Sequence, residues 1–257
     1  MAKTSRIHWY DILLPGAILL VAGVGAWYVI HYPQDSIVAN FITWTRLLTC
    51  LKQHLYLILV SSALAVCTSV PLGIIITRKS FQRLCGPVVA VVNICQTIPS
   101  FAVIALFVGI LGIGAKTAIF ALWIYSLLPI LNNTIAGIRG VNPAMIDAAY
   151  GMGMTKFKTL YKIELPSALP VIFAGIRTAV VINVATAIIA AFVGAGGLGD
   201  LIIAGKNINR MQIMLLGAGY STLLALFIDN ILGLIERLLS HNANAPSQAE
   251  KTPIKAA

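Results

Sequence analysis

The sequence predicts an all-α integral membrane protein with six transmembrane helices, a class supported by its composition, its long apolar segments and its charge distribution. Hydrophobic residues make up 59% of the 257 residues and charged residues only 10%, with a mean hydropathy of +0.91. A soluble domain carries about 25% charged residues because its surface must face water. This chain has too little polar side chain to cover a soluble globule, so we expect a bilayer to surround most of it.

Six apolar segments are long enough to cross a membrane, since a hydrocarbon core of about 30 Å needs about 20 residues of helix. They cover residues 12–30, 55–77, 88–111, 117–138, 168–193 and 212–238. The first follows Lys3 and Arg6 and so invites comparison with a secretory signal peptide. Its apolar run is too long for one, and no Ala-x-Ala cleavage site follows it. We therefore predict an uncleaved helix at 12–31, preceded by a cytoplasmic segment at 1–11.

Lysine and arginine are distributed unequally between the two sides of these segments. With the N-terminus in the cytoplasm, twelve of the 18 basic residues fall on the cytoplasmic side, five on the outer side, and Arg177 inside a span. The positive-inside rule favours this orientation, with both termini cytoplasmic and the protein in the cell (inner) membrane. The net charge of +10 then follows from topology and does not indicate a nucleic-acid partner. Residues 240–257 are rich in Asn, Ala, Pro and Lys, which predicts a disordered cytoplasmic tail.

No residue pattern indicates a catalytic, metal or nucleotide site, so we expect a protein that is not an enzyme. The four cysteines contain no CxxC pair and the four histidines are scattered, which excludes the usual zinc spacings. Segment 194–199 fits GxGxxG but follows an apolar helix instead of a strand, so we expect a tight turn or re-entrant segment there. Segment 109–117 misses the Walker A register, so any ATPase must be a separate polypeptide. Asp229 is the only acid deep in a predicted span and no histidine lies within one, which argues against a membrane-embedded enzyme.

The longest connection between spans, 139–167, lies on the predicted cytoplasmic side. Asn142-Pro143 is suited to begin a helix, with Asn as the cap and Pro in the first turn, and the glycines at 151 and 153 end it. A second, amphipathic helix is expected at 155–165, ended by Pro166. These helices suit either a position on the lipid headgroups or a groove on a soluble partner, and the residues alone leave both interpretations open.

The order of residues in this loop resembles that of ABC importer permeases. Asp147-Ala148-Ala149-x-Gly151 is followed by Ile163 and then by Leu165-Pro166, as in the EAA…G…I.LP loop of that family, with Asp147 where Glu is usual. The resemblance implies a cytoplasmic coupling helix that fits a cleft in the ATPase subunit. It assigns to ATPase coupling the residues Asp147, Ala148, Ala149, Gly151, Gly153, Ile163, Glu164, Leu165 and Pro166. Glu164, Lys158 and Lys162 are expected to meet either complementary charges on the ATPase or lipid headgroups.

Four further segments, 93–100, 127–134, 175–179 and 193–199, are similar to the osmoprotectant subfamily of these permeases, which takes up glycine betaine, choline, carnitine or proline betaine. The resemblance implies a type I transmembrane domain over 53–239, with a five-helix core and an extra first helix outside it. The implied partners are ATPase subunits that hold ATP and Mg²⁺, an extracytoplasmic solute-binding protein, and a second permease, identical or related. No cofactor is expected in this chain. The alternatives are an ABC importer permease for another small solute, such as an amino acid, and a stand-alone secondary transporter.

Polar residues and prolines within the predicted spans have two interpretations. They either join helices and satisfy the carbonyls that proline leaves free, or they line the path of the solute. The candidate path residues are Asn93, Gln96, Thr97, Pro99, Asn132, Asn133, Asn183 and Thr186.

Arg177 and Asp229 are ionisable groups inside spans, where such groups are paired or functional. Each lies about nine residues from the cytoplasmic end of its helix, which at about 1.5 Å per residue places both roughly 14 Å deep. We therefore predict an intramembrane ion pair between them, direct or through water. Such a pair serves equally well as a structural clasp or as part of the transport machinery.

Overall fold

The computed structural model describes residues 9–244, and every regular element in that part of the chain is a helix. This confirms the predicted all-α class. In chain order the helices are α1 (Trp9–His31), α2 (Ser36–Phe41), α3 (Trp44–Thr77), α4 (Cys85–Thr97), α5 (Ser100–Leu111), α6 (Ala115–Arg139), α7 (Pro143–Gly151), α8 (Lys156–Thr159), α9 (Leu165–Thr186), α10 (Leu198–Asn207) and α11 (Met211–Asn244). Short 3-10 helices precede α4 and follow α9, at Gln82–Leu84 and Ala187–Val193.

Five helical segments of the described chain are long and apolar enough to cross a membrane, and a bent helix pair makes a sixth if it counts as one span. The five are Leu13–His31, Trp44–Thr77, Ala115–Arg139, Lys156–Val193 and Met211–Leu239. They follow the order of five of the six predicted segments, so the apolar run lengths identified these spans correctly.

The segment predicted as a span at 88–111 is broken in the structure, where α4 and α5 are separate helices bent by 95° at the break between them. Pro99 explains the break. Proline has no N–H to donate, and it disfavours the helical conformation in the residue before it. Ile98 accordingly adopts an extended backbone, with a ψ of 129°.

α3 begins at Trp44, well before the predicted start at residue 55. Thr43 caps it, since the Thr43 hydroxyl oxygen accepts a hydrogen bond from the Arg46 N–H at 3.2 Å. The earlier start places His54 inside the span Trp44–Thr77, where its side chain is fully buried. The expectation that no histidine lies within a span is therefore wrong.

α11 continues to Asn244 and so enters the segment 240–257 that the sequence predicts as a disordered tail. Up to Asn244 that prediction is wrong, because neither Gly nor Pro interrupts the chain between Gly233 and Pro246. The rest of the predicted tail, 245–257, lies outside the described residues. The same holds for residues 1–8 of the predicted N-terminal segment.

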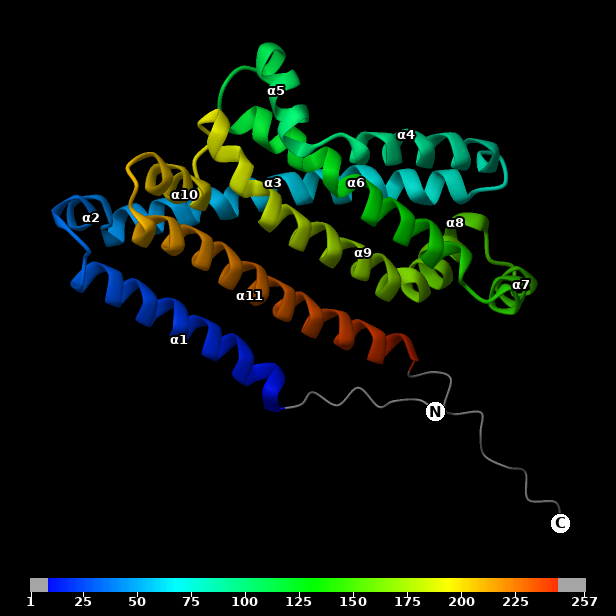
Figure 1. Cartoon of the computed structure of the whole chain (residues 1–257). Coiled ribbons are helices and arrows are strands. Elements are labelled where there is room, and N and C mark those ends of the chain that lie inside the picture. Colours follow the sequence, from blue (N-terminus) through cyan, green and yellow to red (C-terminus); the bar gives the residue numbers. More distant parts are fainter. Residues whose placement is uncertain (1–8, 245–257) are drawn as a thin grey trace.

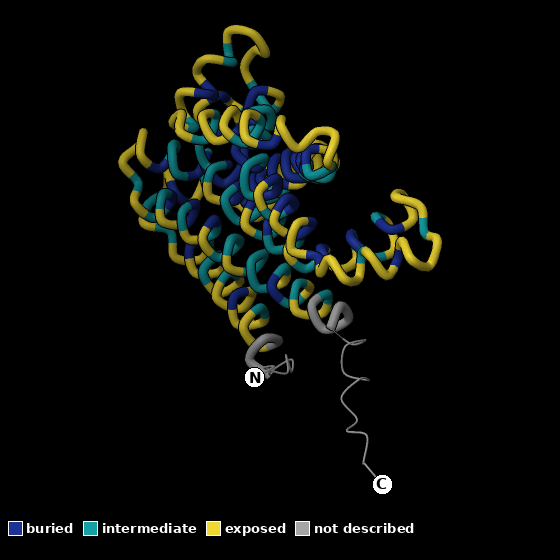
Figure 2. Tube along the Cα trace, turned by 90° about the vertical axis from the view of Figure 1, so that its right-hand side faces the viewer, coloured by how far each residue is buried: buried dark blue, intermediate teal, exposed yellow. Residues whose placement is uncertain are grey.

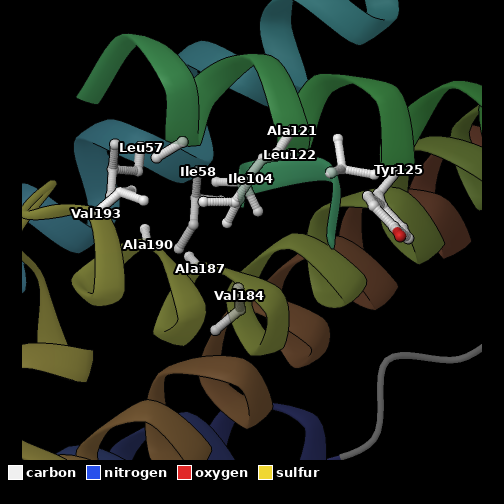
Figure 3. Close-up of a cluster of buried hydrophobic side chains, with 12 residues drawn as sticks. Leu57, Ile58, Ile104, Ala121, Leu122, Tyr125, Val184, Ala187, Ala190 and Val193 are labelled. Atoms are coloured by element: carbon white, nitrogen blue, oxygen red, sulfur yellow. The ribbon is translucent and has the colours of Figure 1, made fainter. Parts of the chain in front are cut away.

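α3, α6 and α9 run side by side through the centre of the molecule (Figure 1). The main cluster of buried apolar side chains lies between them and extends onto α5 and the 3-10 helix after α9 (Figure 3). It contains Leu57, Ile58, Val103, Ile104, Ala118, Ala121, Leu122, Tyr125, Val184, Ala187, Ala190 and Val193. Lipid tails are as apolar as these side chains, so close packing has to hold the helices together.

The contact between α6 and α9 depends on Gly175. A Cβ atom at this position would lie 2.5 Å from Asn133 Cβ and 2.7 Å from the Pro129 carbonyl oxygen, closer than real contacts allow. Small residues at helix interfaces let backbones approach in this way. Gly175 therefore sets the distance between the two helices that border the main core.

α1 packs along α11 at the edge of the bundle (Figure 1). The Tyr220 hydroxyl donates to the Ala22 carbonyl, and the Gln212 side chain both donates to the Tyr32 carbonyl at 3.0 Å and accepts from the Gln34 N–H at 2.7 Å. Polar contacts thus fix the register of a helix whose other faces are largely exposed.

Asp35, in the turn after α1, caps α2 and forms an ion pair with Arg210 in the turn before α11. The hydrogen bond from the Val38 N–H lowers the pKa of the Asp35 carboxyl, and Arg210 adds to this effect while desolvation opposes it. The carboxylate is therefore charged at neutral pH and ties the α1–α2 connection to α11.

Figure 2 shows buried residues where helices meet and exposed residues along their outward sides. Many of the exposed side chains are large and apolar, for example Leu20, Leu59, Leu106 and Ile110. Exposed apolar surface on this scale is unusual for a soluble monomer and is what a surrounding bilayer requires.

Candidate functional site

The loop between α6 and α9 lies at one end of the bundle, where α7 and α8 stand apart from the central helices (Figure 1). Its first helix begins as the sequence predicts: Asn142 Oδ1 accepts a hydrogen bond from the Ala144 N–H at 3.0 Å, and Pro143 occupies the first turn. α7 ends at Gly151, and Gly153 follows with a φ of +77°, a conformation that glycine adopts without strain. The loop helix is therefore fixed by its own caps.

The second loop helix differs from the prediction. α8 passes through a π-helical turn, Leu160–Glu164, directly into α9, and Pro166 lies in the first turn of α9. The expectation that Pro166 ends a helix is wrong, because the helix runs through the π turn and continues past Pro166 as α9. The π turn is closed by the Leu165 N–H, which donates to the Leu160 carbonyl. The loop and α9 thus form one continuous helical path.

α7 and the residue after it present an exposed surface that combines small and large side chains. We call it the α7 surface, and it comprises Met145, Asp147, Ala148, Tyr150, Gly151 and Met152. Ala149, within the same helix, is fully buried. A Cβ atom at Gly151 would meet nothing within 4 Å, so this subunit itself gives no reason for a glycine there. Three large apolar side chains of the surface, Met145, Tyr150 and Met152, are 47%, 44% and 69% exposed.

Glu164 is separated from this surface and buried, at 4% exposure. Its carboxylate accepts two hydrogen bonds from Arg78 at the end of α3, with Nη2–Oε2 at 2.6 Å and Nη1–Oε1 at 3.1 Å. Glu164 is thus bonded within this subunit and is not exposed as Lys158 and Lys162 are, while its assignment to ATPase coupling stays a prediction. Lys158 and Lys162 are exposed.

The remaining predicted coupling residues likewise divide into exposed and partly buried side chains. Ile163 and Leu165 are half-buried, and Leu165 packs against a buried cluster at the base of the loop. Gly153 and Pro166 are exposed. The α7 surface and the base of the loop are therefore distinct parts of the predicted coupling segment.

The structure brings Arg177 and Asp229 together. Arg177 Nε donates to Asp229 Oδ1 at 2.7 Å and Nη2 donates to Oδ2 at 2.9 Å, while Nη1 donates to Glu236 Oε2 at 2.9 Å. The guanidinium lies against Gly233, where a Cβ atom would be 3.0 Å from Arg177 Cζ. These groups line an open cavity of about 390 Å³ between α9 and α11.

Glu236 was missed by sequence reasoning, although a signal was present. Asp229, Gly233 and Glu236 are spaced by four and three residues, which places them on one face of a helix. The pattern of two acids flanking a glycine would have predicted a cationic side chain over that glycine.

Unequal roles for the two carboxylates lead to a testable expectation. Asp229→Asn should lower the free energy of unfolding by about 1 kcal/mol, because Asp229 takes two of the three bonds and the cluster is about one-third exposed. Glu236→Gln should have less than half that effect. Thermal unfolding of the detergent-solubilised variants measures both, and equal effects would contradict the unequal sharing of Arg177.

Among the described residues, no hydrogen bond joins the eight candidate path residues to one another. Asn93, Thr97, Pro99 and Asn132 are exposed. Thr97, Thr186 and Asn133 bond to carbonyls of their own helices, and Asn133 Nδ2 reaches the Pro129 carbonyl at 2.8 Å. Only Gln96 and Asn183 are seen to bond another spanning segment among the described residues.

Gln96 joins two helices and satisfies a carbonyl that a proline leaves without a donor. Pro129 has no N–H, so the Tyr125 carbonyl four residues earlier in α6 lacks its helical partner. Gln96 Nε2, from α4, donates to that carbonyl at 2.9 Å. The amide therefore compensates for the proline in the neighbouring helix.

Asn183 and His54 join α9 to α3 in the interior. Asn183 Nδ2 lies 3.0 Å from the hydroxyl oxygens of both Ser61 and Ser62, and His54 Nε2 lies 3.1 Å from the Val184 carbonyl oxygen. All four side chains are buried. His54 was missed because it directly precedes the predicted span at 55–77.

In the glycine-rich segment 194–199, residues 194–197 form a turn between the 3-10 helix and α10, and Leu198 begins α10. Gly194, Gly196 and Gly197 have φ values of +66°, +79° and +99°. The Gly197 N–H donates to Gln53 Oε1 at 3.1 Å, so the turn packs on α3. A helix precedes it, where a dinucleotide-binding fingerprint would follow a strand.

Comparisons with known proteins are consistent with this geometry. Residues 69–241 match the family described as "Binding-protein-dependent transport system inner membrane component". The glycine betaine/carnitine/choline transport system permease protein OpuCB of Bacillus subtilis (strain 168) is 43% identical over 185 residues, covering 72% of this chain and 84% of the relative. The carnitine transport permease protein OpuCD of Listeria monocytogenes is 48% identical over 177 residues, covering 68% and 78%. The osmoprotectant import permease protein OsmY of Salmonella typhimurium is 41% identical over 189 residues, covering 74% and 80%.

A solved structure shares the fold. The MetNI methionine ABC transporter in an inward-facing conformation aligns with a TM-score of 0.68 at 23% sequence identity, covering 76% of this chain and 97% of the matched chain. At this identity the likeness shows the fold alone, and it confirms the predicted permease architecture.

Proposed function

Because this chain belongs to the family of binding-protein-dependent transport system inner membrane components, we propose that it forms part of the membrane pathway of an ATP-driven importer of quaternary-ammonium osmoprotectants such as glycine betaine, choline and carnitine. The chain is a multi-pass inner-membrane permease subunit, and its family works with an ATPase and a solute-binding protein. The single observation that supports the solute class is the identity of 41–48% to permeases named for these compounds.

The α7–α8 end of the bundle is proposed to face the cytoplasm. Basic residues gather in the loops and helix ends there: Arg78, Lys79, Arg83, Arg139, Lys156, Lys158, Lys162 and Arg237. The positive-inside rule favours a cytoplasmic position for such an end. α1 begins and α11 ends toward this same end (Figure 1), which supports cytoplasmic positions for both termini.

The α7 surface is proposed to dock on the ATPase subunit, which binds ATP and Mg²⁺. Its exposed apolar side chains and the open space at Gly151 suit a groove on a soluble partner better than the headgroup layer. ATP can drive transport only by favouring one conformation of the permease over another, so the free-energy difference has to enter through this contact. The continuous helix from α8 into α9 provides the route into the bundle.

A complete pathway is proposed to need a second permease, either this chain again or a related one. The exposed polar residues Asn93 and Asn132 remain predicted path residues, since neither is shielded by the rest of this chain. Their role stays a prediction until uptake is measured in their alanine variants.

The proposal is tested by uptake into proteoliposomes that contain the permease, its ATPase and the loaded binding protein. We expect ATP-dependent uptake of radiolabelled glycine betaine or choline, and none without ATP or the binding protein. Uptake without the ATPase would show a stand-alone transporter. Uptake of an amino acid, with no uptake of quaternary amines, would keep the importer and refute the solute.

A further inference from the structure

The path from the α7 surface into the bundle is covalent for α9 but not for α3. α8 runs through the π turn Leu160–Glu164 into α9, so α9 follows a displacement of the loop directly. α3 is separated from the loop in the chain by α4, α5 and α6. A movement of the loop reaches α3 only through non-covalent contacts.

Apolar contacts form part of that connection. Ile138, Val141, Ala168 and Ile172 make a buried cluster at the base of the loop, and Ile74 of α3 packs against it. Contacts of this kind are non-directional, so they hold the two helices together without fixing how one turns or slides on the other.

The Arg78–Glu164 ion pair adds direction. Arg78 is the C-cap residue of α3, and Glu164 is the last residue of the π turn. Their two parallel bonds, at 2.6 and 3.1 Å, fix the orientation of the two groups as well as their separation. Arg78 Nε also donates to the Ile74 carbonyl at 3.2 Å, which anchors the guanidinium to the last turn of α3.

We propose that Arg78 and Glu164 are a positioning pair of the transport cycle, which makes α3 move together with α9 when the ATPase displaces the α7 surface. This inference rests on the proposed function. The pair joins a π turn, a feature common at functional sites in helices, to the one end of α3 that lies beside the loop. Without the pair, the Asn183 and His54 bonds still join α9 to α3 deeper in the bundle, but the ends of the two helices beside the loop are no longer held in one orientation. Hydrolysis then proceeds with little transport.

The test compares Glu164→Gln with wild type in the reconstituted complex. We expect ATPase binding and ATP hydrolysis to stay near wild type while uptake falls roughly tenfold, so that more ATP is hydrolysed per solute. The charge-swapped double variant Arg78→Glu/Glu164→Arg should recover much of the uptake, because the pair is restored in reverse. Lys79→Gln, an exposed neighbour of Arg78, is the matched control and should behave as wild type.

Three results would overturn the proposal: unchanged uptake in Glu164→Gln, an equal loss of uptake and ATPase binding, or no recovery in the double variant. If Glu164→Gln does not assemble, Arg78→Lys replaces it, since lysine keeps the charge but not the two-bond fork. Partial uncoupling in Arg78→Lys supports the pair, and normal coupling or a parallel loss of assembly refutes it. If wild type takes up no quaternary amine, the proposed solute class is refuted. Uptake per ATP hydrolysed is then compared between wild type and the pair variants with a solute that does stimulate ATP hydrolysis.

Discussion

Gly151→Asp is expected to lower the affinity of the permease for its ATPase about 100-fold, equivalent to about 3 kcal/mol, while the permease itself stays folded. Gly151 is exposed, and a Cβ atom there meets nothing within 4 Å, so the change has no steric effect inside this subunit. At a docked α7 surface, the new carboxylate would be buried without a partner. Co-purification with the tagged ATPase and titration of binding measure the loss.

Gly86→Asp is the matched control for this experiment. Gly86 is also exposed, and a Cβ atom added there would meet nothing within 4 Å. It lies in the first turn of α4, where a carboxylate is favourable. The control should bind the ATPase as wild type does. Normal binding and normal uptake in Gly151→Asp would refute the docking role of the α7 surface.

Gly175→Ala is expected to lower the free energy of unfolding by about 3 kcal/mol, because the added methyl group overlaps Asn133 and the Pro129 carbonyl. α6 and α9 would have to separate, and both border the main buried cluster. Loss of the monodisperse peak after heating in detergent measures the change in midpoint temperature.

Gly219→Ala in α11 adds the same methyl group where nothing lies within 4 Å, and its effect should stay within about 0.5 kcal/mol. The difference between the two variants in the free energy of unfolding therefore measures the steric effect at Gly175 separately from the general effect of replacing glycine in a helix. Equal stability of both would mean that α6 and α9 are not in close contact at Gly175.

The sequence was most informative where a single physical requirement acts on a continuous run of residues. The bilayer thickness sets the length of an apolar segment, and five spans could be located on that basis. The helix at 143–151 was predictable because Asn142 and Pro143 favour its start through local hydrogen bonding and backbone geometry. The pairing of Arg177 with Asp229 could be predicted because charges within a membrane span need partners.

Contacts between residues far apart in the chain could not be predicted as well from the sequence. Arg78 and Glu164 are 86 residues apart, and nothing in either segment indicates the other. Pro129 indicates that the Tyr125 carbonyl lacks a helical donor, but only the fold shows that Gln96 supplies one. The break at Pro99 had a local signal, yet a proline in a span fits both a kinked helix and two separate helices, and tertiary packing decides between them.

The angle between α4 and α5 restricts what surrounds this subunit. Hydrocarbon tolerates non-helical backbone only where protein covers it or water borders it. The Tyr125 hydroxyl donates to the Ile98 carbonyl and so meets one of the needs of the unwound stretch, but Ile98 and Pro99 are still open on the outer side of this chain. An acyl chain is a poor neighbour for that stretch, so we expect a companion subunit or water, and not lipid, to lie against Ile98 and Pro99.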